Sequence, residues 1–340
     1  MIAMRSHYLY LPSLLVLLAA CAAHEPPYMQ GANFLQSSTV AVDSEAARDS
    51  LVRLRRTGAN TVAFVTFMRQ IAPDSCYISA DPYLDAARLG RAIGFAKEVG
   101  LRVVLKPQIL LPTGWAGDIR MNDEASWQCW FEAYRDHLLG YASLAQEMGV
   151  EELLIGTELK NTEQRPEWRS LITSIRRIYY GRISYAVHDM HDLATFVGMP
   201  LVDRVSVVAY PSLGDSAEPE AMLLQVNKWT AELASIAKII GKPIWVAEVG
   251  ITSRTGAQKD SWVWENATPQ PAIPDTALQA EVLGIWLAAL VAPWNRGVLI
   301  WAWYSDPNAG GLTDTGFTFQ NKPAERIIKC KWSGICQQDK

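Results

Sequence analysis

The chain has 340 residues, of which 49% are hydrophobic, so it is long enough to enclose a large core. Its formal net charge of −4 at pH 7 gives no electrostatic reason to expect a nucleic acid or an anionic surface as a partner. The 13 tryptophans exceed what packing alone usually requires, and part of this set suits a groove that stacks against flat ligand faces.

The N-terminus has the features of a targeting segment rather than of a folded domain. Arg5 and His7 precede an apolar run, residues 9–20, which is too short to span a bilayer as an ordinary helix. The run ends in Leu-Ala-Ala-Cys21, which resembles the lipoprotein box of bacterial signal peptides. That resemblance implies that residues 1–20 are a signal peptide and that Cys21 becomes the lipid-bearing first residue. A plain signal peptide with a chance cysteine is the alternative.

The residues after the cysteine predict a tether and a location. Residues 21–30 include Pro26-Pro27 and are expected to link the lipid to the folded domain. Ala22, rather than Asp, follows the cysteine, and in Gram-negative lipoproteins this resemblance favours the outer membrane. We therefore expect an exported lipoprotein at the outer membrane, cell surface or periplasm, in contact with a membrane only through its lipid anchor.

Removing the lipid-bearing cysteine leaves four, and an even number in an exported chain permits two disulfides. Sequence proximity favours Cys330–Cys336, which closes a loop in a C-terminal tail, residues 330–340. The other pair is then Cys76–Cys129. No Cys-x-x-Cys pair occurs and the five histidines are scattered, so no metal site is expected.

After the tether, apolar strands and helical segments alternate along the chain. Helix ends are marked by signals such as Asp81-Pro82 at one start and Gly58 and Gly100 after two ends. Strands are predicted at residues 31–35, 60–67, 101–107, 153–156, 183–187, 205–209, 244–247 and 297–303. Helices are predicted at residues 44–57, 81–100, 123–148, 166–180, 218–240 and 276–291.

Eight strands, with a predicted helix in six of the seven connections between them, predict an α/β fold, a single-domain (β/α)8 TIM barrel over residues 31–329. No glycine-rich turn follows the first strand, so a dinucleotide fold has no support and no cofactor is expected. The loop at residues 252–274 carries Trp262 and Trp264. Loops of this length are usually functional or disordered.

Two glutamates end hydrophobic strands of the predicted barrel. Glu158 follows Leu-Leu-Ile-Gly-Thr, and Glu248 follows Ile-Trp-Val-Ala. A short apolar run that ends in a charge is typical of a buried parallel strand whose last residue reaches a functional site. In a parallel barrel the active site lies at the carboxyl ends of the strands. Cleavage of a glycosidic bond needs at least two carboxyl groups, and these two glutamates would place them there.

Further polar and aromatic residues follow the same strand ends. They are Lys106, Gln108 and Trp115 after strand three, Lys160 and Asn161 after strand four, His188 and Asp189 after strand five, Tyr210 after strand six, and Trp301, Trp303 and Asp306 at strand eight. With the two glutamates, the chain resembles the clan A retaining glycoside hydrolases, whose acid/base and nucleophile follow strands four and seven. The motifs most similar to family 113, the endo-β-1,4-mannanases, are Gly31-x-Asn33-Phe34, Lys106-Pro107 with Trp115-x-Gly117-Asp118, Gly156-Thr157-Glu158-Leu159 and Trp245-x-x-Glu248-x-Gly250.

The resemblance assigns roles to individual residues. It implies that Glu248 is the nucleophile, with Tyr210 donating to it, and that Glu158 is the acid that becomes the base in the second step. One position departs from the clan pattern, because many clan A enzymes have Asn immediately before the acid/base, where this chain has Thr157. That departure bears on the sugar preference rather than on the cleavage itself.

Substrate contacts are expected from Lys106, Gln108, Trp115, Asn161, His188, Trp301 and Trp303. Trp301 is expected to form the floor of the sugar subsite, and alternation along the strand predicts that Trp303 points the same way. Two roles are open for Trp115, Trp262 and Trp264, namely stacking on a sugar and packing within a loop. For His188 the alternatives are a contact with the ligand and a hydrogen bond that anchors a loop. For Lys106, a sugar hydroxyl or a partner carboxylate is expected.

The function expected from these residues is retaining cleavage of a β-linked polysaccharide, with β-1,4-mannan preferred, by a monomer that does not bind nucleic acid. Another β-glycan or an exopolysaccharide is the alternative substrate. A surface lipoprotein that binds carbohydrate without turnover is the alternative class, although a binding surface would not need both glutamates. A metal-dependent barrel hydrolase is not supported, because the chain has no His-x-His metal-binding motif at the end of the first strand.

Overall fold

The structure is a computed structural model that describes residues 27–264 and 271–336. The strands are β1 (Met29–Leu35), β2 (Thr61–Gln70), β3 (Ile78–Ser79), β4 (Arg102–Leu110), β5 (Glu152–Thr157), β6 (Arg182–Val187), β7 (Arg204–Ala209), β8 (Ile244–Val249) and β9 (Asn295–Tyr304). The α-helices are α1 (Glu45–Arg56), α2 (Ala86–Glu98), α3 (Glu124–Glu147), α4 (Glu167–Arg176), α5 (Pro219–Ile240), α6 (Thr276–Ala289) and α7 (Pro323–Ser333). Short 3-10 turns include η1 (Ala116–Asp118), η2 (Lys160–Thr162), η3 (Met190–Ala194) and η4 (Met199–Leu201).

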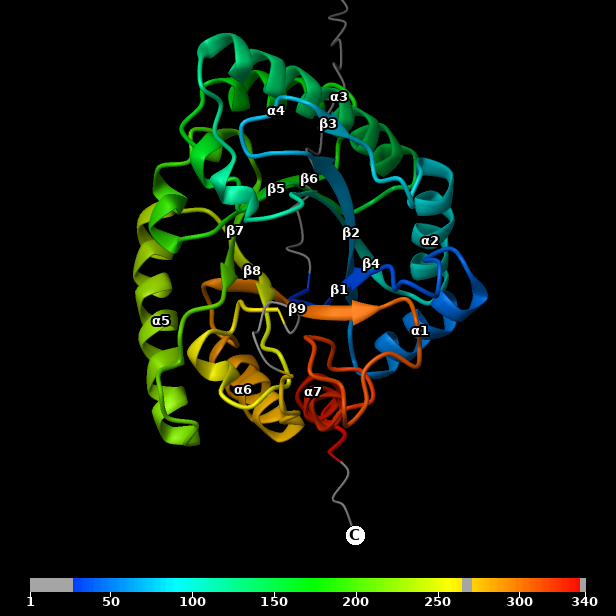
Figure 1. The fold of residues 1–340 in the computed structure, drawn as a ribbon, viewed down its shortest axis with the longest axis vertical. Helices are drawn as coiled ribbons and strands as arrows, with labels where there is room; N and C mark the ends of the chain where they lie inside the picture. The colour runs from blue at the N-terminus through cyan, green and yellow to red at the C-terminus, as the bar shows by residue number, and fades with distance from the viewer. Residues whose placement is uncertain (1–26, 265–270, 337–340) are drawn as a thin grey trace, which may run out of the picture.

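All the strands except β3 form a closed parallel barrel. Neighbours are paired in the order β1-β9-β8-β7-β6-β5-β4-β2, and the pairing of β1 with β2 closes the ring. The helices form a layer around the outside of this ring (Figure 1). β3 adds only an antiparallel extension to the far end of β2. The predicted single-domain (β/α)8 TIM barrel is therefore confirmed.

Apolar side chains fill the barrel and the layer between barrel and helices. Inside the barrel, Val104, Leu154, Trp245 and Leu299 belong to one buried cluster, and each is 1% exposed or less. Trp245 is thus a core residue of the barrel. Parallel strands buried on both faces need this nearly continuous run of apolar residues, which is why their sequences read as unbroken hydrophobic segments.

Several element boundaries differ from the predicted ones, and four of these differences bear on the site or on the ends of the chain. β1 begins at Met29, so the last two residues assigned to the tether belong to the barrel. β4 continues to Leu110, which places Lys106 within the strand rather than at its end. The first turn of α2 begins at Ala86 rather than near residue 81. α7 was not predicted, and it extends into the segment assigned to the C-terminal tail. Only Ala324 and Ile328 among its side chains are buried, so its sequence has too few apolar positions to show a clear helical pattern.

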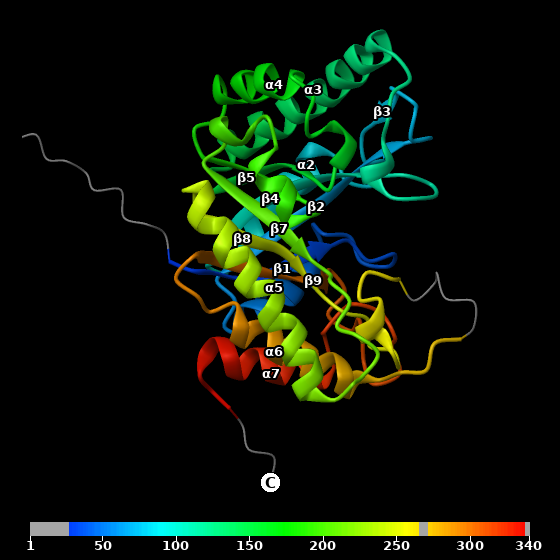
Figure 2. The same ribbon diagram turned by 90° about the vertical axis from the view of Figure 1, so that its left-hand side faces the viewer.

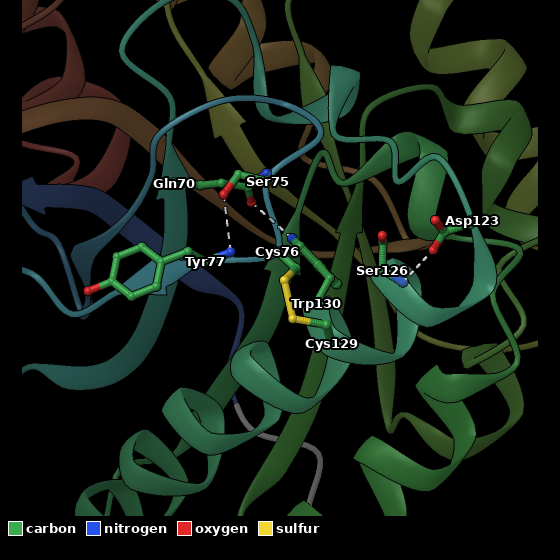
Figure 3. The surroundings of a disulfide bond; sticks show 8 residues. All are labelled: Gln70, Ser75, Cys76, Tyr77, Asp123, Ser126, Cys129 and Trp130. Carbon is green, nitrogen blue, oxygen red and sulfur yellow. Dashed lines mark hydrogen bonds between the residues drawn. A yellow bond between two sulfur atoms is a disulfide. The ribbon is translucent and has the colours of Figure 1, made fainter.

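Both predicted disulfides are formed. Cys76–Cys129 joins the segment between β2 and β3 to α3, and Figure 3 shows its surroundings. Nearby, Trp130 donates a hydrogen bond from Nε1 to Gln70 Oε1 at 2.9 Å. Cys330–Cys336 closes a short loop at the end of α7. The first bridge therefore fixes a loop at the carboxyl end of the barrel against the outer helix layer.

The predictions for the signal peptide, for Cys21 and for most of the tether concern residues that lie outside the described part of the chain. Within the described residues, no helix is both long enough and apolar enough to cross a bilayer.

Candidate active site

The local sequence before Glu158 turns this side chain out of its strand. Between Leu154 and Thr157, β5 has one residue more than the paired segment of β6. Gly156 is needed there, because a Cβ would lie 2.6 Å from Cε2 of Tyr185. Glu158 follows with a φ of 57°, in the left-handed region that non-glycine residues seldom adopt. Strained backbone of this kind concentrates at functional sites, where the surrounding structure enforces it.

Glu158 is held by two aromatic side chains from neighbouring loops. His188 Nδ1 lies 2.6 Å from Glu158 Oε1, and Trp115 Nε1 donates to Glu158 Oε2 at 3.1 Å. The rings of Trp115 and His188 are themselves in contact, with centroids 4.4 Å apart. The hydrogen bond to Glu158 raises the pKa of His188. The carboxyl group of Glu158 is thus fixed in position but remains accessible, since 21% of its side chain is exposed.

Glu248 is held by three hydrogen-bond donors. Lys106 Nζ forms an ion pair with Glu248 Oε1, and Gln108 Nε2 donates to the same oxygen at 2.8 Å. Tyr210 Oη donates to Glu248 Oε2 at 3.0 Å. Burial, together with the negative charge of Glu248, raises the pKa of Tyr210 well above its usual value, so the phenol keeps its proton and donates it. An acceptor surrounded by an ammonium, an amide and a phenol is suited to carry a negative charge.

Burial and charge have opposite effects on the pKa values of the buried pair Lys106 and Glu248. Burial raises the pKa of Glu248; the positive charge of Lys106 opposes that rise, and the nearby charge of Glu158 adds to it. Burial likewise lowers the pKa of Lys106, and Glu248 opposes that change. The pKa of Glu248 therefore depends on the charge of Glu158 as well as on that of Lys106.

Lys106 is fixed by contacts on three sides and is fully buried. Besides Glu248, its ammonium group donates to Asn33 Oδ1 at 2.8 Å, and Asn33 in turn donates to the backbone oxygen of Ala247 at 3.0 Å. Nζ also lies 5.2 Å from the ring centroid of Trp301, within the range of a cation–π contact. The sequence marked Asn33 only as part of a family motif, and its position on β1 did not predict that it would support Lys106.

Trp301 and Trp303 lie on opposite sides of the barrel wall. Trp301 packs with Phe317 near Tyr210, whereas Trp303 is fully buried between barrel and helices and donates from Nε1 to Ser50 Oγ at 2.8 Å. The prediction that both point the same way, and that Trp303 binds substrate, is therefore wrong. Ala32 pairs with residue 300 of β9 but Phe34 pairs with Trp303, so β9 has one extra residue that reverses the alternation.

The remaining predicted residues are placed at the same end of the barrel with different degrees of exposure. Trp264, from the long loop after β8, packs edge-on against Trp301 with ring centroids 6.1 Å apart, while Trp262 is 53% exposed. Asn161 is exposed in η2, three residues after Glu158. Thr157 is buried, and its Oγ1 makes no hydrogen bond to the described protein. Of these groups, Trp264 reaches the catalytic residues through Trp301, and Thr157 directly precedes Glu158.

Glu163 is a buried carboxyl group that the sequence did not single out. It lies just beyond η2, is 2% exposed, and accepts a hydrogen bond from Tyr185 Oη at 3.1 Å. Burial raises its pKa to about 8. No spacing signal could have found it, because its burial depends on loops that pack around η2. As for metals, the described residues contain no group of His, Cys, Asp or Glu side chains arranged to bind an ion.

Comparison with known proteins gives one consistent result. The sequence model of Glycoside Hydrolase Family 113 matches residues 35–322. The fold is similar to that of a GH113 β-mannanase from Alicyclobacillus acidocaldarius, with a TM-score of 0.79 at 24% identity, covering 91% of this chain and 98% of that one. A second GH113 β-1,4-mannanase gives a TM-score of 0.79 at 22% identity, with 91% and 100% covered.

More distant barrels are also similar. A glycoside hydrolase family 5 mannosidase from Rhizomucor miehei gives a TM-score of 0.66 at 13% identity, covering 91% of this chain and 93% of that one. A search of curated protein sequences finds no significant match.

Proposed function

Because the chain belongs to glycoside hydrolase family 113 and is a glycosidase, we propose that it cleaves β-1,4-linked mannan with retention of configuration, using Glu248 and Glu158. The observation that carries this proposal is the contrast between the two carboxyl groups. Glu248 is buried beneath an ammonium, an amide and a phenol, whereas Glu158 is partly exposed beside an indole and an imidazole. One environment suits a nucleophile and the other suits a group that exchanges protons.

In the first step, Glu248 attacks the anomeric carbon while Glu158 gives its proton to the departing glycosidic oxygen. Lys106 and Tyr210 keep the attacking oxygens of Glu248 charged and oriented until the glycosyl–enzyme ester forms. In the second step, Glu158 takes a proton from water, and the hydroxide displaces Glu248 from the sugar. His188 and Trp115 fix the Glu158 carboxyl group during both proton transfers.

Sugar binding is proposed to use the aromatic and polar groups that border the glutamates. Trp301, at the end of β9, is 4% exposed, so a sugar is proposed to contact the rim of its indole ring rather than its whole face. Trp264 packs at a right angle to Trp301. Thr157 occupies the position of the Asn side chain of many clan A enzymes, and its hydroxyl has no hydrogen-bond partner among the described residues. Because this hydroxyl is buried, a sugar hydroxyl can reach it only if the side chains that cover it shift. A hydroxyl has one donor where a carboxamide has two, so this contact is expected to be weaker.

A substrate panel tests the proposal directly. The purified protein is incubated with β-1,4-mannan, β-glucan, xylan and galactan, and new reducing ends are measured. We expect release from mannan well above the other three, with the β-anomer formed first when the products are followed by NMR. Initial release of the α-anomer would contradict double displacement, and preferential release from another polysaccharide would reassign the substrate.

We also propose that the protein is a lipoprotein of the outer membrane, acylated at Cys21. The support is the sequence alone: a short apolar run, the Leu-Ala-Ala-Cys ending and Ala22 after it. Mass spectrometry of the N-terminal peptide from the native protein is expected to find an acylated Cys21 as the first residue. A mature chain that starts at any other residue would contradict the anchor without affecting the enzymatic proposal.

A further inference from the structure

Large apolar side chains are exposed at each connection that leads into the strands from β6 to β9. Tyr180 before β6 is 78% exposed, Leu201 before β7 is 37%, Ile239 before β8 is 81% and Val291 before β9 is 77%. Ile335, just after α7, adds a fifth at 60%. Single exposed apolar residues are ordinary, but one at every successive connection is the pattern of an interaction surface.

These five residues share one end of the molecule. In a parallel barrel the helices run back against the strands, so the end of each helix lies beside the start of the next strand. Figure 2 shows this arrangement: the start of β1 and the final turns of α5 and α7 lie toward the left, and the loop that follows β8 lies toward the right. The apolar residues therefore lie at the amino ends of the strands, and the two glutamates at the carboxyl ends.

The same connections are strongly basic although the chain as a whole is acidic. They comprise residues 177–182, 199–204, 238–244, 290–297 and 331–336. Asp203 is their single acidic residue, whereas the Lys and Arg residues at least partly exposed there are Arg177, Arg182, Lys238, Lys242, Arg296 and Lys331. The connections into β4 and β5, in contrast, have nearly balanced charges, with Glu98, Glu151 and Glu152 beside Lys97 and Arg102. Apolar and basic side chains thus occupy the same half of this end.

The chain enters the barrel at this end and is fixed there. The backbone oxygens of Pro27 and Tyr28 accept hydrogen bonds from Arg102, and Tyr28 Oη donates to the backbone oxygen of Leu290 at 3.2 Å. Eight residue steps separate Met29 from Cys21, so covalent geometry limits the distance between them to about 28 Å. α5 has 22 residues, which corresponds to a length of about 33 Å along the barrel. A lipid on Cys21 therefore cannot reach the catalytic end.

We propose that this end of the barrel, which we call the docking face (Tyr180, Leu201, Ile239, Val291, Ile335 and the basic residues around them), lies on a phospholipid bilayer with anionic headgroups. The inference rests on the proposed lipid anchor at Cys21, which holds the docking face at high local concentration beside the bilayer. The apolar side chains enter the interfacial region and the Lys and Arg side chains approach the phosphates. The glutamates then point away from the membrane, toward polysaccharide in solution.

The experiment measures the depth of two positions in the lipidated full-length protein. The protein is reconstituted into vesicles of phosphatidylethanolamine and phosphatidylglycerol, with an environment-sensitive fluorophore on either Val291→Cys or Ile71→Cys. Ile71 is 68% exposed at the opposite end of the molecule and serves as the matched control. We expect a blue shift, and quenching by a lipid-borne quencher, at residue 291 but not at residue 71. A fluorophore at Tyr180→Cys should show the same blue shift and quenching. With the fluorophore at that position, the double variant Ile239→Asp/Val291→Asp should lose most of the signal, and the control variant Ile71→Asp/Leu224→Asp should keep it.

Each other result overturns the proposal in a distinct way. No quenching at residue 291, or quenching at residue 71 that equals or exceeds it, would show that the docking face is not the surface that faces the lipid. A blue shift at residue 291 that appears without vesicles and grows with protein concentration would assign the face to self-association. Mass spectrometry of the same sample tests the anchor independently, and hydrolysis of a soluble mannan oligosaccharide tests the proposed function. Failure of the docking face, of the lipid anchor and of the enzymatic proposal can therefore be told apart.

Discussion

The ion pair between Lys106 and Glu248 gives the sharpest test of the proposed nucleophile. Lys106→Met removes the ammonium group and keeps an unbranched apolar side chain in a site that is fully buried. Glu248 retains Gln108 and Tyr210 as donors but loses the charge that opposes the effect of burial on its pKa. The pKa of Glu248 should therefore rise further, and a protonated Glu248 cannot attack the sugar.

The size of the effect follows from the burial of the pair. Removing one partner of a buried ion pair typically costs about 3–5 kcal/mol, because the other charge is left uncompensated. Expressed as a change in rate, each ~1.4 kcal/mol of lost transition-state stabilisation corresponds to about a tenfold change. At neutral pH we expect kcat/KM to fall by about 10²-fold or more, and the acidic limb of the pH profile to move to higher pH.

The assay is a pH profile of kcat/KM on a soluble mannan oligosaccharide, with thermal unfolding as the control for folding. Gln108→Met is the matched comparison, because Gln108 donates to the same oxygen of Glu248 but is neutral and partly exposed. Water can replace its amide, so a loss of about tenfold or less with a nearly unchanged pH profile is expected. If a folded Lys106→Met variant keeps the wild-type profile and most of its activity, the proposed role of the pair is refuted.

Four further predictions follow from the same structure. Glu248→Ala should abolish hydrolysis with the fold intact, and added azide should restore turnover to an α-glycosyl azide; wild-type activity without azide would exclude Glu248 as the nucleophile. Glu158→Ala should cleave activated aryl glycosides far better than mannan, because a good leaving group needs no proton; equal losses on both substrates would point to another donor. Burial raises the pKa of Glu163 from 4.5 to about 8, so the folded state binds the proton more tightly than the unfolded state does. The free energy of unfolding should therefore fall as the pH rises from about 4.5 to 8, by at most about 5 kcal/mol. Measured by urea unfolding, this pH dependence should be flatter in Glu163→Gln, and the same pH dependence in both proteins would contradict the role of Glu163. Replacing both Cys76 and Cys129 by Ala opens a bridge of sequence separation 53 and should lower the free energy of unfolding by about 2–4 kcal/mol, whereas an unchanged value would show that the bridge adds no stability.

The sequence by itself determined the fold and the positions of the two glutamates. Parallel strands buried on both faces must be apolar throughout, so a carboxyl group at the end of such a strand stands out against it. Glu158 and Glu248 were found in this way, and the alternation of strands and helices then predicted that both lie at one end of the barrel. The pairing Cys330–Cys336 was also accessible, because a short loop brings its ends together at little entropic cost.

The tertiary structure decided which side chains meet. Lys106 and Glu248 are 142 residues apart in sequence, and nothing local to either residue specifies the contact or the supporting bond from Asn33. Trp303 turned outward because β9 has one residue more than β1 opposite it, and only the paired strand reveals such a bulge. Periodicity predicts the face on which a side chain lies only while the register holds. Register, loop packing and the burial of groups such as Glu163 are set by contacts between distant segments, and these exist only in the folded barrel.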